Sequence, residues 1–345
     1  MSRGIVTVIA GNILMLLLSS DMIFSQPAGE QSLMIMFYNV ENLFDIYDDP
    51  ATDDDEFLPR SERRWNYKRY KSKINSLYKT ISAAGEWTPP AIVALCEVEN
   101  RKVIEDVVYG TNLSKFNYDI LHQDSPDPRG IDVCLIYRKE IVDIISRSYF
   151  IPETEIGGGF KTRSVLYARC LAGGDTVHLF INHWPSRRGG VLAGESVREN
   201  IAQMLRYKAD SIANSTERSA KIIIMGDFNA TPNDNVVRML SDPYGSGMSM
   251  INLSETQMKG TYRYRGIWEM IDQVIVSDRL LFCKQGLYTT RENFRIFDAD
   301  FLLKKDPVYP GKSPYSTWAG FMYQGGFSDH LPVLLELRVR QGVNR

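Results

Sequence analysis

Four short apolar runs, each followed directly by polar residues, constrain the fold of this chain more than any other feature. The runs begin at Met34, Ile92, Leu179 and Ile222, and each is typical of a buried β-strand that leads into a surface loop. Their polar ends are Asn39 and Glu41, Glu97, Asn182 and His183, and Asp227 and Asn229. Polar side chains at the same ends of neighbouring strands converge on one crevice, where sheet-based enzymes keep their sites. The sequence therefore predicts a shared site at one edge of a sheet.

The rest of the pattern predicts further strands and two long helices. Strand-like runs cover residues 118–121, 131–137, 164–172 and 176–181. The core face expected for the first helix is Tyr67, Tyr70, Ile74, Leu77, Tyr78 and Ile81. Its other face, which includes Lys73, is basic and typical of a solvated surface. The second helix begins at Ser196 with a capping box to Glu199, and its expected core face is Ile201, Met204, Leu205, Ala209 and Ile212. This order favours an α/β (α+β) fold with mixed sheets face to face and helices outside.

The composition indicates one globular domain with a large core. The chain has 345 residues, of which 44% are hydrophobic, and it contains no internal repeat or low-complexity linker. We therefore expect a single catalytic domain over residues 32–340. A net charge of −2 excludes a dedicated nucleic-acid packaging protein, because that class is strongly basic. The same charge is compatible with an enzyme that handles nucleic acid briefly.

Residues 1–25 have the order of a secretory signal peptide. Arg3 precedes an apolar stretch from Ile5 to Leu18, and small polar residues follow it. The stretch is shorter than the roughly 20 apolar residues that a membrane-spanning helix needs. We expect a cleaved signal and a secreted or periplasmic protein. An uncleaved anchor is the alternative, because bulky Ile23 lies at the third position before the expected cut.

An acidic run follows the first predicted strand. It comprises Asp48, Asp49 and residues 53–56. The run lacks the glycine and the ligand spacing of a calcium-binding loop, so we expect a solvated loop.

The four cysteines are Cys96, Cys134, Cys170 and Cys283. They form no CxxC pair and no Cys/His cluster, which argues against a zinc site. Cys96 and Cys134 lie inside apolar strand patterns, so buried free thiols are favoured over disulfides.

The polar residues at the strand ends suit metal-assisted phosphoester hydrolysis. That reaction needs a hard cation, a positioned water and hydrogen-bond donors aimed at the phosphoryl group. Mg²⁺ prefers oxygen ligands, and we expect Mn²⁺ to substitute for it. The candidate ligands are Asn39, Glu41, Glu97 and Asp329. His183 and His330 can donate to a phosphate or exchange a proton near neutral pH. Each residue alone also has a structural interpretation, and only the complete set indicates a site.

Together these stretches resemble the endonuclease/exonuclease/phosphatase superfamily of metal-dependent phosphoesterases. The matching stretches are residues 38–41, 95–97, 181–183, 226–229, 271–272 and 328–332. They extend over nearly all of the chain after the N-terminal segment. The resemblance implies a four-layer sandwich, with two mixed β-sheets face to face, helices outside and a site at one edge.

The resemblance also implies a role for each matching residue. Glu97 would be the principal Mg²⁺ ligand, with help from Asn39, Glu41 and Asp329. Asp227, oriented by Asn229, would position or deprotonate the attacking water, or else protonate the leaving oxygen. His330, held by Asp272, and His183 would bond the scissile phosphate from two sides.

Two details depart from the common pattern of the superfamily. Many members carry Gln before the metal-binding Glu, and this chain has Cys96 there. The segment over residues 182–190 is longer and more basic than a bare strand end. It resembles the version found in secreted bacterial members, some of which are extracellular nucleases.

Several residues outside these motifs are candidates for substrate binding. They are Arg187, Arg188, Arg263 and Trp268. Guanidinium groups and an aromatic ring can line a groove for a phosphate-rich chain, although core packing and solvated arginines are an equal alternative. We also expect residues 294–327 to form a long loop that acts as a substrate lid.

The sequence favours a monomeric nuclease that acts on DNA or RNA and has no stable protein partner. One alternative is a phosphatase or a phospholipid phosphodiesterase on the same fold, acting on inositol phosphates or sphingomyelin. A binding protein that keeps the fold without turnover is a remote alternative, because no expected catalytic residue is missing.

Overall fold

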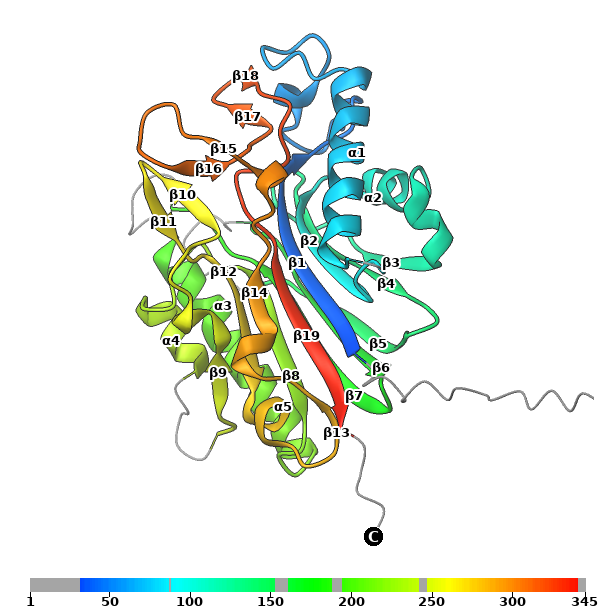
Figure 1. The fold of residues 1–345 in the computed structure, drawn as a ribbon, viewed down its shortest axis with the longest axis vertical. Helices are drawn as coiled ribbons and strands as arrows, with labels where there is room; N and C mark the ends of the chain where they lie inside the picture. The colour runs from blue at the N-terminus through cyan, green and yellow to red at the C-terminus, as the bar shows by residue number, and fades with distance from the viewer. Residues whose placement is uncertain (1–31, 87, 153–160, 188–193, 242–246, 341–345) are drawn as a thin grey trace, which may run out of the picture. The chain divides into compact units, whose positions relative to one another are not determined.

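The computed structural model describes residues 32–86, 88–152, 161–187, 194–241 and 247–340, and two mixed β-sheets form the centre of this part (Figure 1). The first sheet has the strand order β13-β19-β1-β2-β4-β3, and β14 also pairs with β19. Its strands are β1 Ser32–Leu43, β2 Ile92–Val98, β3 Tyr118–His122, β4 Asp132–Arg138, β13 Gly286–Tyr288, β14 Phe294–Ile296 and β19 Val333–Arg340. The second sheet has the order β5-β6-β7-β8-β12-β9. Its strands are β5 Val142–Phe150, β6 Val165–Ala172, β7 Asp175–His183, β8 Lys221–Asp227, β9 Met250–Asn252 and β12 Asp272–Ser277.

Helices cover the outer face of each sheet. The first sheet carries α1 Tyr67–Ala84 and α2 Arg101–Val108, and the second carries α3 Glu195–Ser215 and α4 Asn235–Ser241 (Figure 1). A short helix, α5 Asp278–Phe282, follows β12. The order helix, sheet, sheet, helix confirms the predicted four-layer sandwich.

Three hydrophobic clusters separate the layers, and the alternation of β1 explains two of them. Ile35 and Phe37 point toward the second sheet and join the cluster between the sheets. Met36 and Tyr38 point the other way and pack under α1 and α2. Successive strand residues face opposite sides of a sheet, so one strand buried on both faces reads as a continuous apolar run. The third cluster packs α3 and α4 against the second sheet.

The strand directions bring the polar strand ends together. β1 and β2 are parallel neighbours in one sheet, and β7 and β8 are parallel neighbours in the other. β12 runs antiparallel to β8 in a register that places Asp272 opposite Asp227. The C-terminal ends of β1, β2, β7 and β8 and the start of β12 therefore meet at one edge of the sandwich.

Both long helices differ from the sequence-based expectation in detail. Tyr67, expected in the core, is 62% exposed, whereas Lys73, expected at the surface, is 1% exposed. The helix α3 begins at Glu195, and its N-cap is Gly194, which forms no side-chain cap bond. The predicted capping box at Ser196 is therefore wrong, because Ser196 already lies in the first helical turn.

The segment over residues 294–327 is not the long open loop that we expected. It contains β14, which pairs with β19, and two hairpins. The hairpins are β15 Leu303–Lys305 with β16 Lys312–Pro314, and β17 Trp318–Ala319 with β18 Met322–Tyr323. Figure 1 shows them near a third hairpin, β10 Tyr262–Tyr264 with β11 Ile267–Glu269, beyond the edge where the polar strand ends meet.

Several sequence-based predictions concern residues outside the described part. The signal peptide over residues 1–25 and Arg188 both lie there. Among the helices that the structure describes, none combines the length and the apolar character needed to cross a membrane. Cys96, Cys134 and Cys170 are buried thiols, and Cys283 is half-buried.

Candidate active site

A cavity of about 620 Å³ opens at the edge where the polar strand ends meet. Most of its lining is polar or charged. The lining residues are Asn42, Glu97, Arg129, Arg163, His183, Ser186, Arg187, Asp227, Asn229, Tyr262, Tyr264, Glu269, Ile271, Asp329 and His330. The predicted residues Glu97, His183, Asp227, Asn229 and His330 are thus brought together from both sheets.

Glu97 stands at the end of β2 on left-handed backbone, with φ of 62°. Its Oε2 accepts a bond of 2.9 Å from the backbone N–H of Asn42. Its Oε1 lies 3.4 Å from the Asn39 amide nitrogen and 3.8 Å from Nε2 of His183. The carboxylate is therefore held at the cavity wall by neighbours on two strands, β1 and β7.

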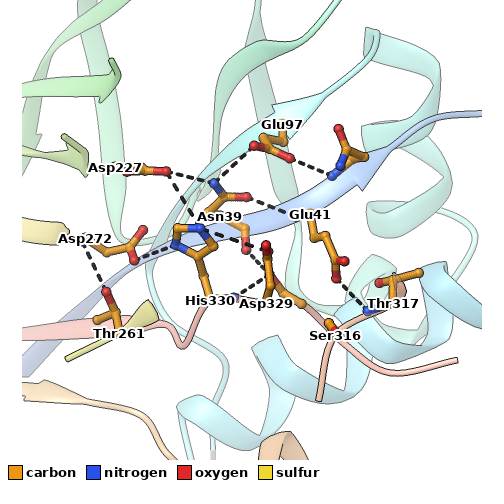
Figure 2. A network of polar contacts seen from close by, with 12 residues as sticks. Asn39, Glu41, Glu97, Asp227, Thr261, Asp272, Ser316, Thr317, Asp329 and His330 are labelled. Carbon is orange, nitrogen blue, oxygen red and sulfur yellow. Dashed lines mark hydrogen bonds and ion pairs between the residues drawn. The ribbon is translucent and has the colours of Figure 1, made fainter. Parts of the chain in front are cut away.

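Asn39 lies between the two main carboxylates of the site (Figure 2). Its Nδ2 donates to Asp227 Oδ2 at 3.0 Å and to Glu97 Oε1 at 3.4 Å. Its Oδ1 accepts from the backbone N–H of Glu41 at 3.0 Å. The amide oxygen, which we expected to bind metal, is thus bonded to backbone, and the amide N–H groups orient Glu97 and Asp227.

Asp272, His330 and Asp227 form a compact group of ionisable residues (Figure 2). His330 Nδ1 lies 2.7 Å from Asp272 Oδ2, which makes Nδ1 the protonated nitrogen, and its Nε2 lies 3.9 Å from Asp227 Oδ2. Burial alone would lower the pKa of His330, but the Asp272 carboxylate bonded to it raises that pKa well above the ordinary value. Burial raises the pKa of Asp227 to about 7, although His330 opposes the shift.

His183 has the opposite electrostatic environment. Its Nε2 lies 3.8 Å from both Glu97 Oε1 and Asp227 Oδ2, and its Nδ1 is buried without a partner among the described residues. Burial lowers the pKa of His183 well below the ordinary value, and the nearby Arg163 and Arg129 lower it further. The cavity therefore contains one charged and one neutral imidazole.

Asn229 follows β8 on left-handed backbone, with φ of 46°. Its N–H donates to Asp227 Oδ1 at 2.8 Å, and its side-chain amide donates to the Trp184 carbonyl at 2.9 Å. Asp227 is thus fixed at both oxygens, by Asn229 and by Asn39, as an orienting role for Asn229 requires.

Glu97 and Asp329 fit a hard divalent cation better than the other acidic residues do. Asp329 lines the cavity with 42% of its side chain exposed. Its partial removal from water raises its pKa, His330 opposes the shift, and the Glu97 carboxylate raises the pKa further. Two carboxylates that approach one cavity and disfavour each other's charge suit a shared cation. The close group Asp227, Asp272 and His330 fits one less well, because Asp272 is already bonded to His330 and Asp227 accepts from Asn39 and Asn229.

Glu41 lies beside the cavity rather than in it. Its carboxylate accepts backbone N–H bonds from Thr317 at 2.5 Å and from Trp318 at 3.1 Å (Figure 2). Burial raises its pKa to about 8, with a further rise from Asp329 and an opposing effect from Lys73. Both oxygens of Glu41 therefore hold the segment before Asp329, and the carboxylate lies outside the cavity lining.

The predicted substrate-binding residues are placed unequally. Arg187 lines the cavity, but its guanidinium is bonded to the Asn229 carbonyl at 2.7 Å and to Asp234 at 2.8 Å. Arg263 lies outside the lining and is bonded to Asp306 and to three backbone carbonyls. Trp268 also lies outside it and packs near Arg263 and Lys259. The structure does not bring Arg263 and Trp268 to the cavity.

Two arginines that the sequence did not indicate, Arg129 and Arg163, also line the cavity. Arg129 donates to Asn42 Oδ1 at 2.7 Å, and Arg163 is buried beside Asp127 with Nε 3.0 Å from its carboxylate. Arg129 lies between β3 and β4, in an Asp-Pro-Arg-Gly sequence that is typical of a turn. Nothing in its local pattern indicated that this turn reaches the site.

The fold and the site define a class of enzymes, those that cleave phosphoesters with a metal ion. The chain belongs to the Endonuclease/Exonuclease/phosphatase family, whose model matches residues 34–339. Members of this family are metal-dependent phosphoester hydrolases, and the chain is an enzyme of this kind. A search of curated proteins found no significant match.

Solved structures with the same fold include proteins from bacteria and vertebrates. An endonuclease/exonuclease/phosphatase family protein from Bacteroides thetaiotaomicron is 14% identical, covers 90% of this chain and 96% of its own, and has a TM-score of 0.57. The B. thetaiotaomicron mannosyl-6-phosphatase is 14% identical, with 88% and 99% covered and a TM-score of 0.56. TDP2 from D. rerio, solved with a single-strand DNA product, is 15% identical, with 89% and 99% covered and a TM-score of 0.53. At these identities the similarity establishes the fold alone.

Proposed function

We propose that the protein is an exported, Mg²⁺-dependent nuclease that hydrolyses phosphodiester bonds in DNA or RNA. The observation that carries this proposal is the presence of two guanidinium groups, those of Arg129 and Arg163, in the lining of the cavity that also contains His330. A nuclease contacts phosphates beyond the scissile one, whereas a small phosphomonoester has none to offer. The fold is shared with TDP2, which was solved with a DNA product.

The charge balance around these two guanidinium groups supports binding of a second phosphate. Arg163 is buried and paired with Asp127. Among the side chains of the described residues, the Arg129 guanidinium is bonded to the neutral amide of Asn42 and to no carboxylate. One carboxylate thus faces two guanidinium groups. Burial is the main cause of the lowered pKa of Arg163, and the Arg129 charge lowers that pKa further. The Asp127 carboxylate opposes the shift. An anionic group near Arg129 would compensate the excess positive charge.

The residues of the chain can carry the steps of hydrolysis. Glu97 and Asp329 would hold the cation, which supplies Lewis acidity and neutralises charge on the phosphoryl oxygens. His330, kept protonated by Asp272, donates a hydrogen bond to a phosphoryl oxygen. His183 is neutral and bonds the phosphate through Nε2. Asp227 orients the attacking water and takes its proton, or gives a proton to the leaving oxygen, and a pKa of about 7 permits either role.

A phosphatase or phospholipid phosphodiesterase is the second candidate function. Arg187, which was expected to contact flanking phosphates, is already neutralised by Asp234, with Glu269 3.8 Å away. That pairing makes the cavity less positive around Arg187, which suits a smaller substrate. The mannosyl-6-phosphatase of B. thetaiotaomicron shares the fold.

Export of the protein is part of the proposal and rests on residues 1–25 alone. Their charged, apolar and small-residue order is that of a signal peptide. Expression of the full chain in a bacterial host, followed by fractionation and N-terminal sequencing, tests it. Full-length protein in the cytoplasmic fraction would contradict export.

The substrate class is tested with Arg129→Gln and a matched control, Arg147→Gln. Arg147 is exposed on β5 and outside the cavity lining, so both variants lose one positive charge. Assays with Mg²⁺, Mn²⁺ or EDTA would use DNA, RNA, a sugar phosphate, a phospholipid and a small chromogenic phosphodiester. We expect EDTA to abolish activity and Arg129→Gln to raise KM for the polymer and reduce its salt slope by roughly one. The small diester should retain its kcat, and the control should match the wild type.

Two outcomes would overturn parts of this proposal. Turnover of a sugar phosphate or a lipid without any nuclease activity would favour the second candidate. Full activity in EDTA would contradict the metal requirement itself.

A further inference from the structure

A second group of carboxylates lies outside the cavity, in the loop between β1 and α1. Asp48, Asp54 and Asp55 each offer an oxygen atom, and these atoms lie within 4.8 Å of one another. The sequence suggested a solvated acidic loop, but Asp54 is only 1% exposed. That expectation is wrong for Asp54, which the loop encloses while Asp48 and Asp55 remain at the surface.

The buried carboxylate of Asp54 is only half satisfied. Its Oδ2 accepts from the backbone N–H of Asp49 at 3.0 Å. Its Oδ1 is buried and has no hydrogen-bond partner among the described residues. A buried carboxylate oxygen without a donor is costly, so such an atom calls for an explanation such as a bound ion.

This group differs from the other two close groups of acidic and histidine side chains in the described part. His122 is bonded to Asp132 at 3.0 Å, and the Ser125 N–H donates to the same carboxylate. The Asp227, Asp272 and His330 group is joined by the 2.7 Å bond between Asp272 and His330. In both cases the carboxylates have donors, whereas Asp48, Asp54 and Asp55 form no ion pair with any described Lys, Arg or His.

Neighbouring acids add to the negative charge around Asp54. Asp45 and Asp49 each accept a backbone N–H within their own turns. Glu99 is buried, and burial raises its pKa to about 8. The backbone N–H of Asp45 opposes this shift, whereas the carboxylates of Asp45 and Asp54 add to it. Burial is also the main cause of the raised pKa of Asp54. Asp45 and Asp49 thus add negative charge near Asp54, and no compensating cation lies near it among the described side chains. Glu99 adds little charge near neutral pH, because its raised pKa favours the protonated carboxyl group.

We propose that Asp48, Asp54 and Asp55 bind one calcium ion that is separate from the catalytic metal. Ca²⁺ binds oxygen at about 2.3–2.6 Å, so ligands on opposite sides of the ion lie about 5 Å apart. Mg²⁺ has bonds of about 2.0–2.1 Å, so ligands on opposite sides of that ion lie about 4 Å apart. Three carboxylate oxygens that lie within 4.8 Å of one another can surround one Ca²⁺, and water completes the six to eight ligands that this ion takes.

The position of the loop gives such an ion a structural effect near the cavity. The Asp53 N–H donates to the Pro128 carbonyl at 2.7 Å. The next residue, Arg129, lines the cavity and is bonded to Asn42. An ion that orders the acidic loop would therefore also support the turn that presents Arg129, whichever substrate the enzyme takes.

The test measures Ca²⁺ binding and thermal unfolding of the full chain, with Asp54→Asn as the variant. Asp53→Asn is the matched control, because Asp53 is exposed in the same run and outside the group. Asp54→Asn should weaken Ca²⁺ binding by about tenfold or more. Substitution of a residue that only hydrogen-bonds to a metal ligand already lowers metal affinity by about that factor. Without Ca²⁺, the same variant should have a Tm equal to or above that of the wild type, because a buried charge is removed. With saturating Ca²⁺ the wild type should be the more stable protein.

A Glu97→Gln variant separates this ion from the catalytic metal. We expect it to retain the Ca²⁺-dependent rise in Tm that Asp54→Asn loses. Terbium luminescence gives an independent readout, with exposed Tyr47 beside Asp48 as a sensitiser. Equal loss of Ca²⁺ binding in Asp53→Asn and Asp54→Asn would overturn the site, because it would indicate diffuse attraction by the acidic run. A single Ca²⁺ site that Glu97→Gln abolishes would overturn it as well.

Discussion

The two histidines of the cavity differ in charge because their partners differ. His330 faces Asp272 at 2.7 Å with Asp227 beyond it, and these carboxylates favour the imidazolium. His183 is buried near Arg129 and Arg163, which favour the neutral ring. One ring is thus a fixed donor for a phosphoryl oxygen, while the other can bond the phosphate without adding charge.

The pairing of Asp272 with His330 predicts a non-additive loss of activity. Asp272→Asn keeps the shape of the side chain but removes the charge that holds the imidazolium. We expect each single variant, Asp272→Asn and His330→Gln, to lower kcat by roughly 10²–10⁴-fold, the usual contribution of a proton-transferring group. The double variant should lose little more, because residues that act as a unit do so. Strictly multiplicative losses in kcat would mean that the two residues act independently.

The sequence identified the residues of the site better than it identified their contacts. The strand-end rule selected Glu97, Asp227 and His183 because strand direction alone brings them to one edge. It assigned Glu41 to the metal, whereas Glu41 binds backbone N–H groups 276 and 277 residues further along the chain. Arg263 likewise bonds carbonyls in a later segment. Such partners are set by tertiary packing, which local pattern does not contain.

At the scale of elements, α1 anchors the segment that carries the last site residues. Lys73 donates to the Thr317 hydroxyl and, at 2.6 Å, to the Phe327 carbonyl. Phe327 directly precedes Ser328, whose hydroxyl donates to the Asn39 carbonyl at 2.7 Å and accepts from the His330 N–H at 3.1 Å. The helix, β1 and the His330 segment are therefore joined through buried polar contacts.

This anchor predicts a large effect of Lys73→Met on stability. The change removes two buried donor contacts, leaves the Phe327 carbonyl with only the 3.3 Å bond from the Thr317 hydroxyl, and removes the positive charge near Glu41. We therefore expect a loss of about 3 kcal/mol in the free energy of unfolding. Lys68→Met is the control, because Lys68 is exposed on the same helix. Urea denaturation of both variants measures the difference. Equal midpoints for Lys73→Met and Lys68→Met would show that the buried contacts contribute little.

Long elements were predictable from sequence, and short ones were not. The strands β1, β2, β7 and β8 have apolar runs that identify them without further information. The hairpins built from β10, β11 and β15 to β18 have strands of two or three residues, too short for periodicity to register. Their composition therefore resembled an open loop, and the expected long loop over residues 294–327 was wrong for that reason. The role of this segment as a substrate lid stays a prediction.

At the scale of the whole molecule, each core layer has its own polar inclusions. His178 on β7 lies in the layer that packs α3 on the second sheet, and it is 6% exposed. Its Nδ1 lies 2.8 Å from the Tyr167 hydroxyl on the neighbouring strand. Burial lowers the pKa of His178 to about 4, and the Arg169 charge adds to the effect.

The lowered pKa of His178 predicts how global stability depends on pH. Between about pH 6.5 and 4 the unfolded chain binds a proton at this residue and the folded chain does not, so acid favours unfolding. The stabilisation is complete above pH 6.5 and is lost as the pH falls, by at most about 3 kcal/mol. Unfolding curves of the wild type and His178→Gln should therefore converge or cross as the pH is lowered through this window. Parallel curves would mean that His178 titrates normally in the folded protein.

Moving this site into another protein would require more than its side chains. Glu41, Asn42, Glu97 and Asn229 all stand on backbone with φ between 46° and 62°. Non-glycine residues adopt that conformation at a cost of about 1–3 kcal/mol each, and here the surrounding layers enforce it. A recipient sandwich with the same residues on ordinary extended backbone would aim these carboxylates and amides in other directions. A transfer of the site must therefore include the left-handed bends at the strand ends, because the catalytic side chains take their positions from that backbone.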